Sequence, residues 1–330
     1  MIELPEFHEV SYATDGDARS AMLKMTKAER QRKAEDILVR YPRFQAAYAQ
    51  VYGLHKQGPE GAPILGEIVG FLGNSRAGKS WLLQAMLRDA LLEQQRADQD
   101  KAERGEATAG LVLPMAYIEV KDKWGAPDMA TALYIATGAT SVPYIAGKSL
   151  EIKCVRRVAS MQTEFIIFDD AHYIFDAPPS KRKGMLSLIK SLADSRKCTV
   201  LLAGLNSIEA GMQDHRQHFN RGGFPAANLL EHDTTLQDQL DHYLEFLAAV
   251  SERLPFAEDS GLDRDDWIEE WRLAAGGSVG LTMNIVKDAA RRAIRDDAPC
   301  IQGRHLAEAC FMRKRIGSET YGFQKFRKAV

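Results

Sequence analysis

Four short apolar runs stand out between residues 64 and 207, and longer stretches with helical periodicity separate them. They read ILGEIVGFLG, LVLPMAYIEV, EFIIFDD and KCTVLLAGLNS. Short apolar runs bounded by polar or glycine-rich segments predict buried strands. The intervening patterns predict helices over about 79–94, 128–137, 149–162 and 182–194. Strands that alternate with helices predict an α/β fold with a parallel sheet and helices on both faces.

Helical patterns also flank this region. Residues 18–51 favour helix, and Pro42 is placed to begin a second helix because proline is tolerated in a first helical turn. After the fourth strand the pattern is mostly helical, over about 207–214, 234–253, 263–275, 279–296 and 303–312. We therefore expect an N-terminal helical extension at 1–57, an α/β core at 58–233, a small helical lid at 234–312 and a basic C-terminal tail at 313–330.

Composition narrows the class of protein. The 330 residues are 45% hydrophobic and 27% charged, with a net charge of −2, so any nucleic-acid site has to be a local patch. The four cysteines form no CxxC pair, which favours a reducing compartment over a disulfide framework or a zinc site. The acidic N-terminus has no signal-peptide pattern, and no apolar run approaches membrane-spanning length. We expect a cytoplasmic protein that does not interact with membranes.

The segment GNSRAGKS fits the phosphate-loop pattern G-x-x-x-x-G-K-[ST] and lies between a predicted strand and a predicted helix. Glycines at 73 and 78 let backbone N–H groups turn inward around phosphates. Lys79 is placed to reach the β- and γ-phosphates, and Ser80 to donate its hydroxyl to Mg²⁺. The nucleotide-binding residues expected here are Gly73, Asn74, Ser75, Arg76, Ala77, Gly78, Lys79, Ser80 and Trp81.

The third strand ends in two acids, in FIIFDDAH. In a phosphate-loop protein a carboxylate at the tip of a neighbouring strand completes the metal shell, so Asp169 is expected to hold Mg²⁺ together with Ser80. Asp170 stands where a base that polarises water is expected. His172 could orient Asp170, couple the site to DNA or to a neighbouring subunit, or fill a structural role. The expected cofactors are ATP and Mg²⁺.

These features, with the strand VLLAGLN and the lid segment GGSVGLTMNIVKDAARRAI, resemble those of AAA+ ATPases. The N-terminal helix with YPR more specifically resembles the TniB/TnsC group of transposon ATPases, which are related in role to MuB and IstB. The resemblance implies ATP-dependent rings or helical filaments on duplex DNA. Such oligomers recruit a TniQ-like target-selection protein and a transposase, and ATP hydrolysis disassembles them.

The same resemblance assigns roles residue by residue. Asn206 matches the sensor of the γ-phosphate, and Arg221 or Arg216 matches the finger that reaches a neighbour's ATP. With Lys79 and Asp170 they form the expected catalytic set. Relatives usually carry Glu where this chain has Asp170, and the shorter side chain implies slow turnover because hydrolysis depends on positioning the water.

Contacts to DNA would have to come from a stripe repeated in each subunit, since avidity multiplies weak contacts. The candidate residues are Lys121, Lys123, Lys148 and Lys153. Each could equally be an ordinary surface lysine with no role in DNA binding. The segment 181–184 is a further basic patch, and the basic, aromatic C-terminal tail is either a docking peptide or a frayed end.

Three other functions stay open on the sequence. ATP could act as structural glue in a scaffold that does not hydrolyse it. The chain could be an AAA+ loader for replication, which the motifs separate poorly from a transposition regulator. More distantly, it could be a phosphate-loop kinase of small molecules, which would need an acceptor pocket.

Overall fold

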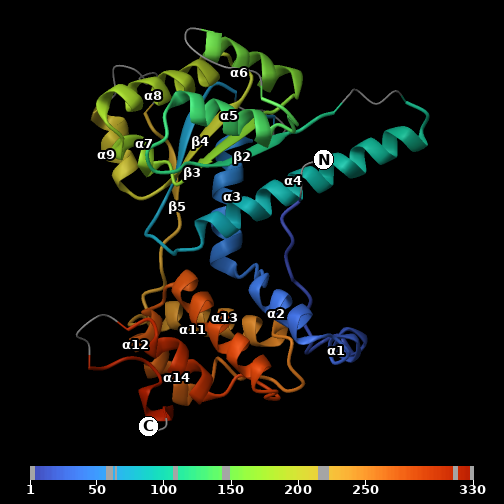
Figure 1. Cartoon of the computed structure of the whole chain (residues 1–330), viewed down its shortest axis with the longest axis vertical. Coiled ribbons are helices and arrows are strands. Elements are labelled where there is room, and N and C mark those ends of the chain that lie inside the picture. Colours follow the sequence, from blue (N-terminus) through green and yellow to red (C-terminus); the bar gives the residue numbers. More distant parts are fainter. Residues whose placement is uncertain are drawn as a thin grey trace. The chain divides into compact units, whose positions relative to one another are not determined.

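The computed structural model describes residues 4–56, 62–63, 65–106, 111–142, 149–214, 223–314 and 319–327. The chain divides into two compact units (Figure 1). Unit 1 comprises Met1–Pro5, Ala46–Ser75 and Lys79–Leu229. Unit 2 comprises Glu6–Gln45, Arg76–Gly78 and Leu230–Val330. Among the described residues, no helix combines the length and the apolar character needed to cross a membrane.

Unit 1 is built on a five-stranded sheet in which every pair of neighbouring strands is parallel. The strand order is β2-β3-β4-β1-β5. The strands are β1 (Ile68–Leu72), β2 (Met115–Glu119), β3 (Phe165–Asp169), β4 (Thr199–Gly204) and β5 (Ala226–Asn228). The four expected strands are confirmed, and β5 is additional. Because the strands are parallel, all their carboxyl ends lie on one edge of the sheet.

Helices cover both faces of this sheet, as the alternation of side chains along each strand requires. The helices of unit 1 are α3 (Pro42–His55, which begins in unit 2), α4 (Lys79–Glu103), α5 (Ala126–Ala136), α6 (Ser149–Ser160), α7 (His172–Asp176), α8 (Pro179–Asp194) and α9 (Ser207–Asp214). On one face Ala116, Ile166 and Val200 lie side by side and pack into a buried cluster with α5, α6 and α8.

The opposite face carries the other set of strand residues and meets α3 and α4. His55, at the end of α3, stacks on the ring of Phe165 with 4.7 Å between ring centroids. Its Nδ1 lies 2.9 Å from the hydroxyl oxygen of Thr199. Both faces are therefore closed to water, which explains the continuous apolar character of the strands.

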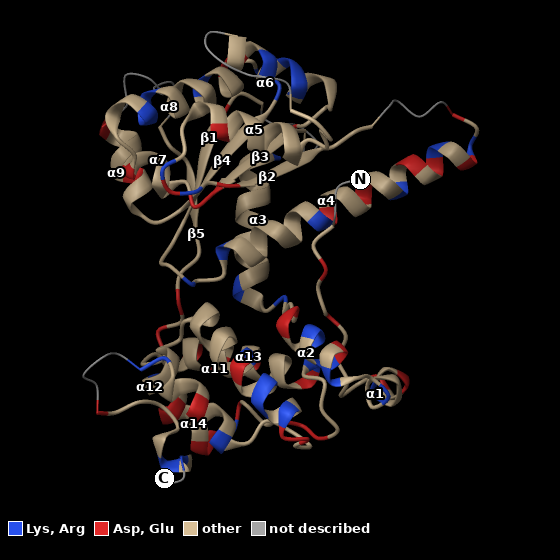
Figure 2. Cartoon of the chain, viewed as in Figure 1, with Lys and Arg blue, Asp and Glu red and all other residues tan. Residues whose placement is uncertain are grey.

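Helix α4 has 25 residues and continues beyond Gln94, where its apolar pattern fades, through the polar segment that follows. Its distal half extends away from the sheet (Figure 1). Figure 2 shows basic and acidic residues interspersed along that half. Such a pattern is typical of a solvated helix stabilised by i,i+4 pairs, as in the hydrogen bond from Gln94 to Asp98 at 2.9 Å.

Unit 2 is helical. Its elements are α1 (Gly16–Met22), α2 (Lys27–Glu35), α11 (Gln237–Arg253), η2 (Asp265–Trp267), α12 (Ile268–Ala275), α13 (Val279–Arg295), α14 (Gly303–Phe311) and η3 (Gln324–Phe326). The buried side of α13 packs against both α14 and α2. Residues 6–45, treated above as a separate N-terminal extension, thus share one core with the C-terminal helices.

The described part of the C-terminal tail, residues 319–327, folds onto unit 2. Phe323 is fully buried, and its ring meets those of Trp267 and Trp271 edge-on at 5.4 and 4.9 Å between centroids. Gly322 permits this approach, because a Cβ there would lie 2.4 Å from the carbonyl oxygen of Glu270. This segment is part of the hydrophobic core, so over these residues the tail is not a frayed end.

Candidate functional site

The phosphate-loop segment connects the end of β1 to the start of α4, as the sequence predicts. Leu229 donates its N–H to the carbonyl of Leu72 at 2.9 Å, which brings the Leu229 carbonyl against Gly73. A Cβ at Gly73 would lie only 2.3 Å from that oxygen, so no larger residue fits without a backbone shift. Gly78 has φ +100, a conformation that L side chains rarely adopt.

Lys79 begins α4 and is 8% exposed. Its Nζ donates hydrogen bonds to the carbonyl oxygens of Gly73 at 2.8 Å and Asn74 at 2.7 Å. The loop therefore curls around its own lysine. Ser80 follows in the first turn of α4, where the positive end of the helix dipole favours anions.

Asp169 ends β3 and is 1% exposed. Its Oδ1 accepts the backbone N–H of Asp170 at 2.9 Å, and its Oδ2 accepts the hydroxyl of Tyr117 at 2.7 Å. Each carboxylate oxygen has one donor, so lone pairs remain on both for a metal ion or its water. The carboxylate is held in one orientation at the carboxyl edge of the sheet.

Asp170 leaves the strand with φ +52, and its side chain is 43% exposed. One of its carboxylate oxygens lies 3.9 Å from Nδ1 of His172. Burial raises the pKa of Asp170, and the charges of Asp169 and Glu119 raise it further. A carboxylate with a raised pKa is a stronger proton acceptor, which suits the role expected from the sequence.

Asn206 lies just after β4, and its side chain is exposed. Since β4 is the strand between β1 and β3, the sheet order puts Asn206 between the phosphate loop and Asp169 along the carboxyl edge. Arg216 and Arg221 lie outside the described residues, so the arginine finger stays a prediction.

The residues at this edge fit a magnesium nucleotide better than a bare metal ion. Among the described residues, no group of three or more His, Cys, Asp and Glu side chains is arranged to hold a metal. Mg²⁺ needs no such cage when phosphates are present, because it usually takes one or two protein oxygens together with phosphate oxygens and water. Asp169 and Ser80 are the residues that would hold it.

Comparison with known proteins identifies the family. The family model described as "Bacterial TniB protein" matches residues 30–231. The chain belongs to the TniB family. No curated protein matches this TniB-family chain.

Three solved structures with the same fold are distant in sequence. A Walker-type ATPase of Pyrococcus abyssi is 15% identical with a TM-score of 0.51, covering 84% of this chain and 73% of that one. The ORC2 protein of Aeropyrum pernix, solved as ADPNP–ADP complexes, is 14% identical with a TM-score of 0.55, covering 82% and 67%. Cdc6p of Pyrobaculum aerophilum is 13% identical with a TM-score of 0.52, covering 83% and 68%. At these identities they confirm the P-loop AAA+ fold and leave function to other arguments.

Some of the candidate DNA-contacting lysines lie close to one another. Lys121 and Lys123 are exposed in the loop that follows β2. Nζ of Lys181, in the first turn of α8, donates to the carbonyl oxygen of Lys123, so the basic segment 181–184 adjoins this loop. Lys153 lies on α6. Lys148 falls outside the described residues.

Two residues that touch the site were missed from the sequence: Tyr117 on β2 and Gln84 on α4. The one available signal for Tyr117 was a hydroxyl inside an otherwise apolar strand. Gln84 stands four residues after Ser80, which places both on one side of α4. Neither signal identifies a partner without the strand register.

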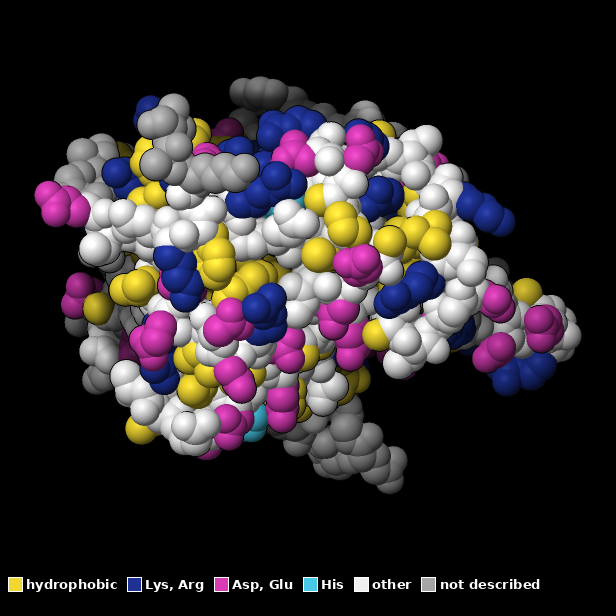
Figure 3. Space-filling view, turned by 90° about the horizontal axis from the view of Figure 1, so that it is seen from below, with side chains coloured by type: hydrophobic (Ala, Val, Ile, Leu, Met, Phe, Trp, Pro, Cys, Tyr) yellow, Lys and Arg dark blue, Asp and Glu magenta, His cyan; other side chains and the backbone are white. Residues whose placement is uncertain are grey.

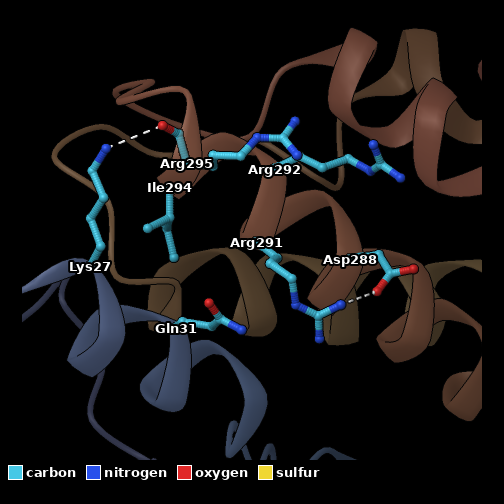
Figure 4. Close-up of a pocket in the computed structure, with 7 residues that line it drawn as sticks. All are labelled: Lys27, Gln31, Asp288, Arg291, Arg292, Ile294 and Arg295. Carbon is cyan, nitrogen blue, oxygen red and sulfur yellow. Dashed lines mark hydrogen bonds and ion pairs between the residues drawn. The ribbon is translucent and has the colours of Figure 1, made fainter.

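Unit 2 carries a pocket of about 410 Å³ between α2 and α13, lined by Lys27, Gln31, Asp288, Arg291, Arg292, Ile294 and Arg295 (Figure 4). Three of its four basic residues pair with acids: Arg291 lies 2.9 Å from Asp288 and 3.0 Å from Glu35, Lys27 lies 2.7 Å from Asp297, and Arg295 lies 3.3 Å from Asp296. Figure 3 likewise shows side chains of both signs interspersed on the face that it draws. The pocket is an ion-paired seam between two helices and not a basic patch.

Proposed function

We propose that this TniB-family chain is an ATP-dependent AAA+ regulator of DNA transposition. In this proposal Mg²⁺–ATP binds at the carboxyl edge of the unit 1 sheet. The nucleotide-bound protein forms a ring or filament on duplex DNA and recruits a transposase and a TniQ-like target-selection protein. Slow hydrolysis then resets the assembly.

One observation carries the proposal. In a chain of this family, a phosphate loop with a buried lysine follows one strand of a parallel sheet, and a buried, hydrogen-bonded carboxylate stands at the end of another. Lys79 begins α4 just after the loop that follows β1, and Asp169 ends β3; β1 and β3 flank β4. A phosphate bound by the loop and a metal held by Asp169 would thus share one edge of the sheet. The oligomer, the DNA and the protein partners rest on the family resemblance.

Lys121, Lys123 and Lys181 are the residues through which unit 1 would contact DNA phosphates. They are exposed and belong to one surface. Each phosphate that such residues neutralise releases counterions, so binding should weaken steeply as the salt concentration rises. Substituting two of the three lysines by glutamine should reduce that salt dependence.

Electron microscopy with duplex DNA tests the proposal. The samples are wild type and Lys79→Ala, each without nucleotide, with ATP and with a slowly hydrolysed analogue. Rings or filaments that need nucleotide and are lost in Lys79→Ala are expected. A wild-type protein that stays monomeric and ignores DNA under all conditions would overturn the transposition proposal.

The geometry of Asp170 favours a second candidate, an ATP-bound scaffold that does not hydrolyse. Its side chain is one methylene shorter than the Glu that relatives usually carry, and its backbone leaves the strand at φ +52, in the left-handed region. Phosphate release with and without DNA separates the two functions. If DNA stimulates phosphate release and Asp170→Asn abolishes it, the protein is a hydrolytic switch. If the protein binds nucleotide but releases no phosphate, it is a scaffold.

A further inference from the structure

We infer that Tyr117 is a positioning residue for the magnesium site: its hydroxyl holds the carboxylate of Asp169 and links it to Gln84 on the phosphate-loop helix. The inference rests on the proposed function, because it concerns how that site would hold Mg²⁺–ATP. It assigns a role to a side chain that no motif of the chain includes.

The strand register brings the two groups together. Glu119 of β2 pairs with Asp169 of β3, and Tyr117 pairs with Ile167. Residues two apart on a strand share a face, so Tyr117 and Asp169 are diagonal neighbours on the face covered by α4. The hydroxyl oxygen of Tyr117 lies 2.7 Å from Oδ2 of Asp169.

A second hydrogen bond fixes the hydroxyl itself. The side chain of Gln84 hydrogen-bonds to Tyr117 and acts to lower its pKa, which is the effect of a donor on the phenol oxygen. A three-membered relay follows, in which the Gln84 amide donates to the Tyr117 hydroxyl and that hydroxyl donates to Asp169. Because Gln84 stands one turn after Ser80, the relay joins the two elements that would supply the metal's protein oxygens.

The hydroxyl of Tyr117 is the donor in its pair with Asp169. Burial raises the pKa of Tyr117 above its usual value, and the charge of Asp169 raises it further. A protonated phenol can only donate to the carboxylate. It therefore occupies one lone pair of Oδ2 and holds that oxygen in place.

Loss of this donor should affect the metal more than the nucleotide. Without Tyr117, the hydrogen bond from the Asp170 N–H to Oδ1 would remain, but Oδ2 would have lost its donor. The carboxylate could then rotate away from the orientation that suits the ion. Outer partners of metal ligands typically change metal affinity by about 10- to 100-fold.

The test is Tyr117→Phe, which removes one oxygen and keeps the ring. A fluorescent ATP analogue is titrated with the full chain in excess EDTA, and then at fixed nucleotide with increasing Mg²⁺. We expect similar affinity in EDTA, and at least about a 10-fold rise in the Mg²⁺ concentration that gives half of the magnesium-dependent response. Gln84→Met, which leaves Tyr117 in place, should shift the response in the same direction by less.

Tyr134→Phe is the matched control. It also deletes one tyrosine hydroxyl in unit 1, where the hydroxyl donates to the carbonyl of Lys153 at 3.3 Å. It should leave the Mg²⁺ response unchanged. A Mg²⁺ response in both Tyr117→Phe and Gln84→Met within twofold of wild type would overturn the inference while the proposed function stands. A wild-type chain that binds no nucleotide would overturn both.

Discussion

The ammonium nitrogen of Lys79 lies 2.8 Å from the carbonyl oxygen of Gly73, six residues earlier in the chain. The loop thus places a positive charge, 8% exposed, at the centre of its own turn. An ATP phosphate would compete with the Gly73 and Asn74 carbonyls for that charge, and a charge-assisted bond to phosphate is the stronger one.

We therefore expect Lys79→Ala to lose ATP binding while it keeps its fold. In wild type, ATP at 100 times its Kd should stabilise the protein by about 2.7 kcal/mol, seen as a rise in Tm that grows with ATP concentration. The variant should show no such rise, whereas Lys101→Ala, on the distal half of α4, should match wild type. An ATP-dependent rise in Lys79→Ala equal to that of wild type would contradict the assignment.

Two glycines of unit 1 should respond to alanine with opposite signs. A Cβ at Gly73 would lie 2.3 Å from the Leu229 carbonyl oxygen, so the backbone has to move at Gly73 or at Leu229, which follow the paired strands β1 and β5. A Cβ at Gly53, in α3, would meet no heavy atom of the described residues within 4 Å. We expect Gly73→Ala to lower the free energy of unfolding by about 1–3 kcal/mol. Gly53→Ala should raise it by about 0.5–1 kcal/mol, because alanine is the better helix former.

Urea denaturation of both variants checks these signs, since a shift in midpoint at constant slope reports a change in stability. The two substitutions add the same methyl group to the same unit, so each serves as the control for the other. Equal destabilisation by both would mean that the close approach at Gly73 does not limit stability.

The sequence predicts those features of the structure that depend on residues close together in the chain. The phosphate loop, the terminal acid of β3 and four of the strands depend on local patterns, and the structure places them as expected. Strand β5 was missed because its residues, Ala226–Asn228, form no apolar run. Its pairing with β1 comes from the sheet and not from its own composition.

The partners of the site residues were also beyond local patterns. Tyr117 and Asp169 are 52 residues apart, and only the β2–β3 register puts them in contact. Similarly, residues 6–45 pack with helices near the other end of the chain, which no helical periodicity reveals. Local sequence patterns predict the motifs, whereas the side chains that contact them depend on the tertiary structure.

The C-terminal segment should contribute to the stability of unit 2. Phe323 is fully buried against Trp267 and Trp271. Phe323→Ala removes a buried aromatic ring, and we expect a loss of about 3 kcal/mol in the free energy of unfolding. Trp81 and Trp124 lie in unit 1, so both are replaced by phenylalanine in the background chain, and tryptophan fluorescence during urea denaturation then reports unit 2.

Leu273→Ala is the control for that substitution. Leu273 lies on α12, two residues after the buried Trp271, but is 63% exposed. Its truncation should change stability by less than about 0.5 kcal/mol. If Phe323→Ala were as mild as Leu273→Ala, the segment would not be part of the core of unit 2.

Unit 1 should lose stability in mild acid through His55. Burial, together with a smaller effect of the charge of Lys56, lowers the pKa of His55 from 6.5 to about 4. Between these values the unfolded chain binds a proton that the folded chain excludes, so stability falls as the pH falls. The stabilisation is fully present above about pH 6.5 and is lost progressively towards pH 4, by at most about 3 kcal/mol.

Hydrogen exchange of the β3 and β4 amides measures this effect within unit 1, after correction for intrinsic exchange rates. His55 touches both strands, through Phe165 and Thr199. In wild type, the protection of these amides should decrease between pH 7 and pH 5. His55→Asn can still hydrogen-bond to Thr199 but does not titrate, so it should flatten the decrease, whereas His242→Asn, at an exposed position of α11, should leave it unchanged. A decrease as steep in His55→Asn as in wild type would show that another group carries the acid sensitivity of the sheet.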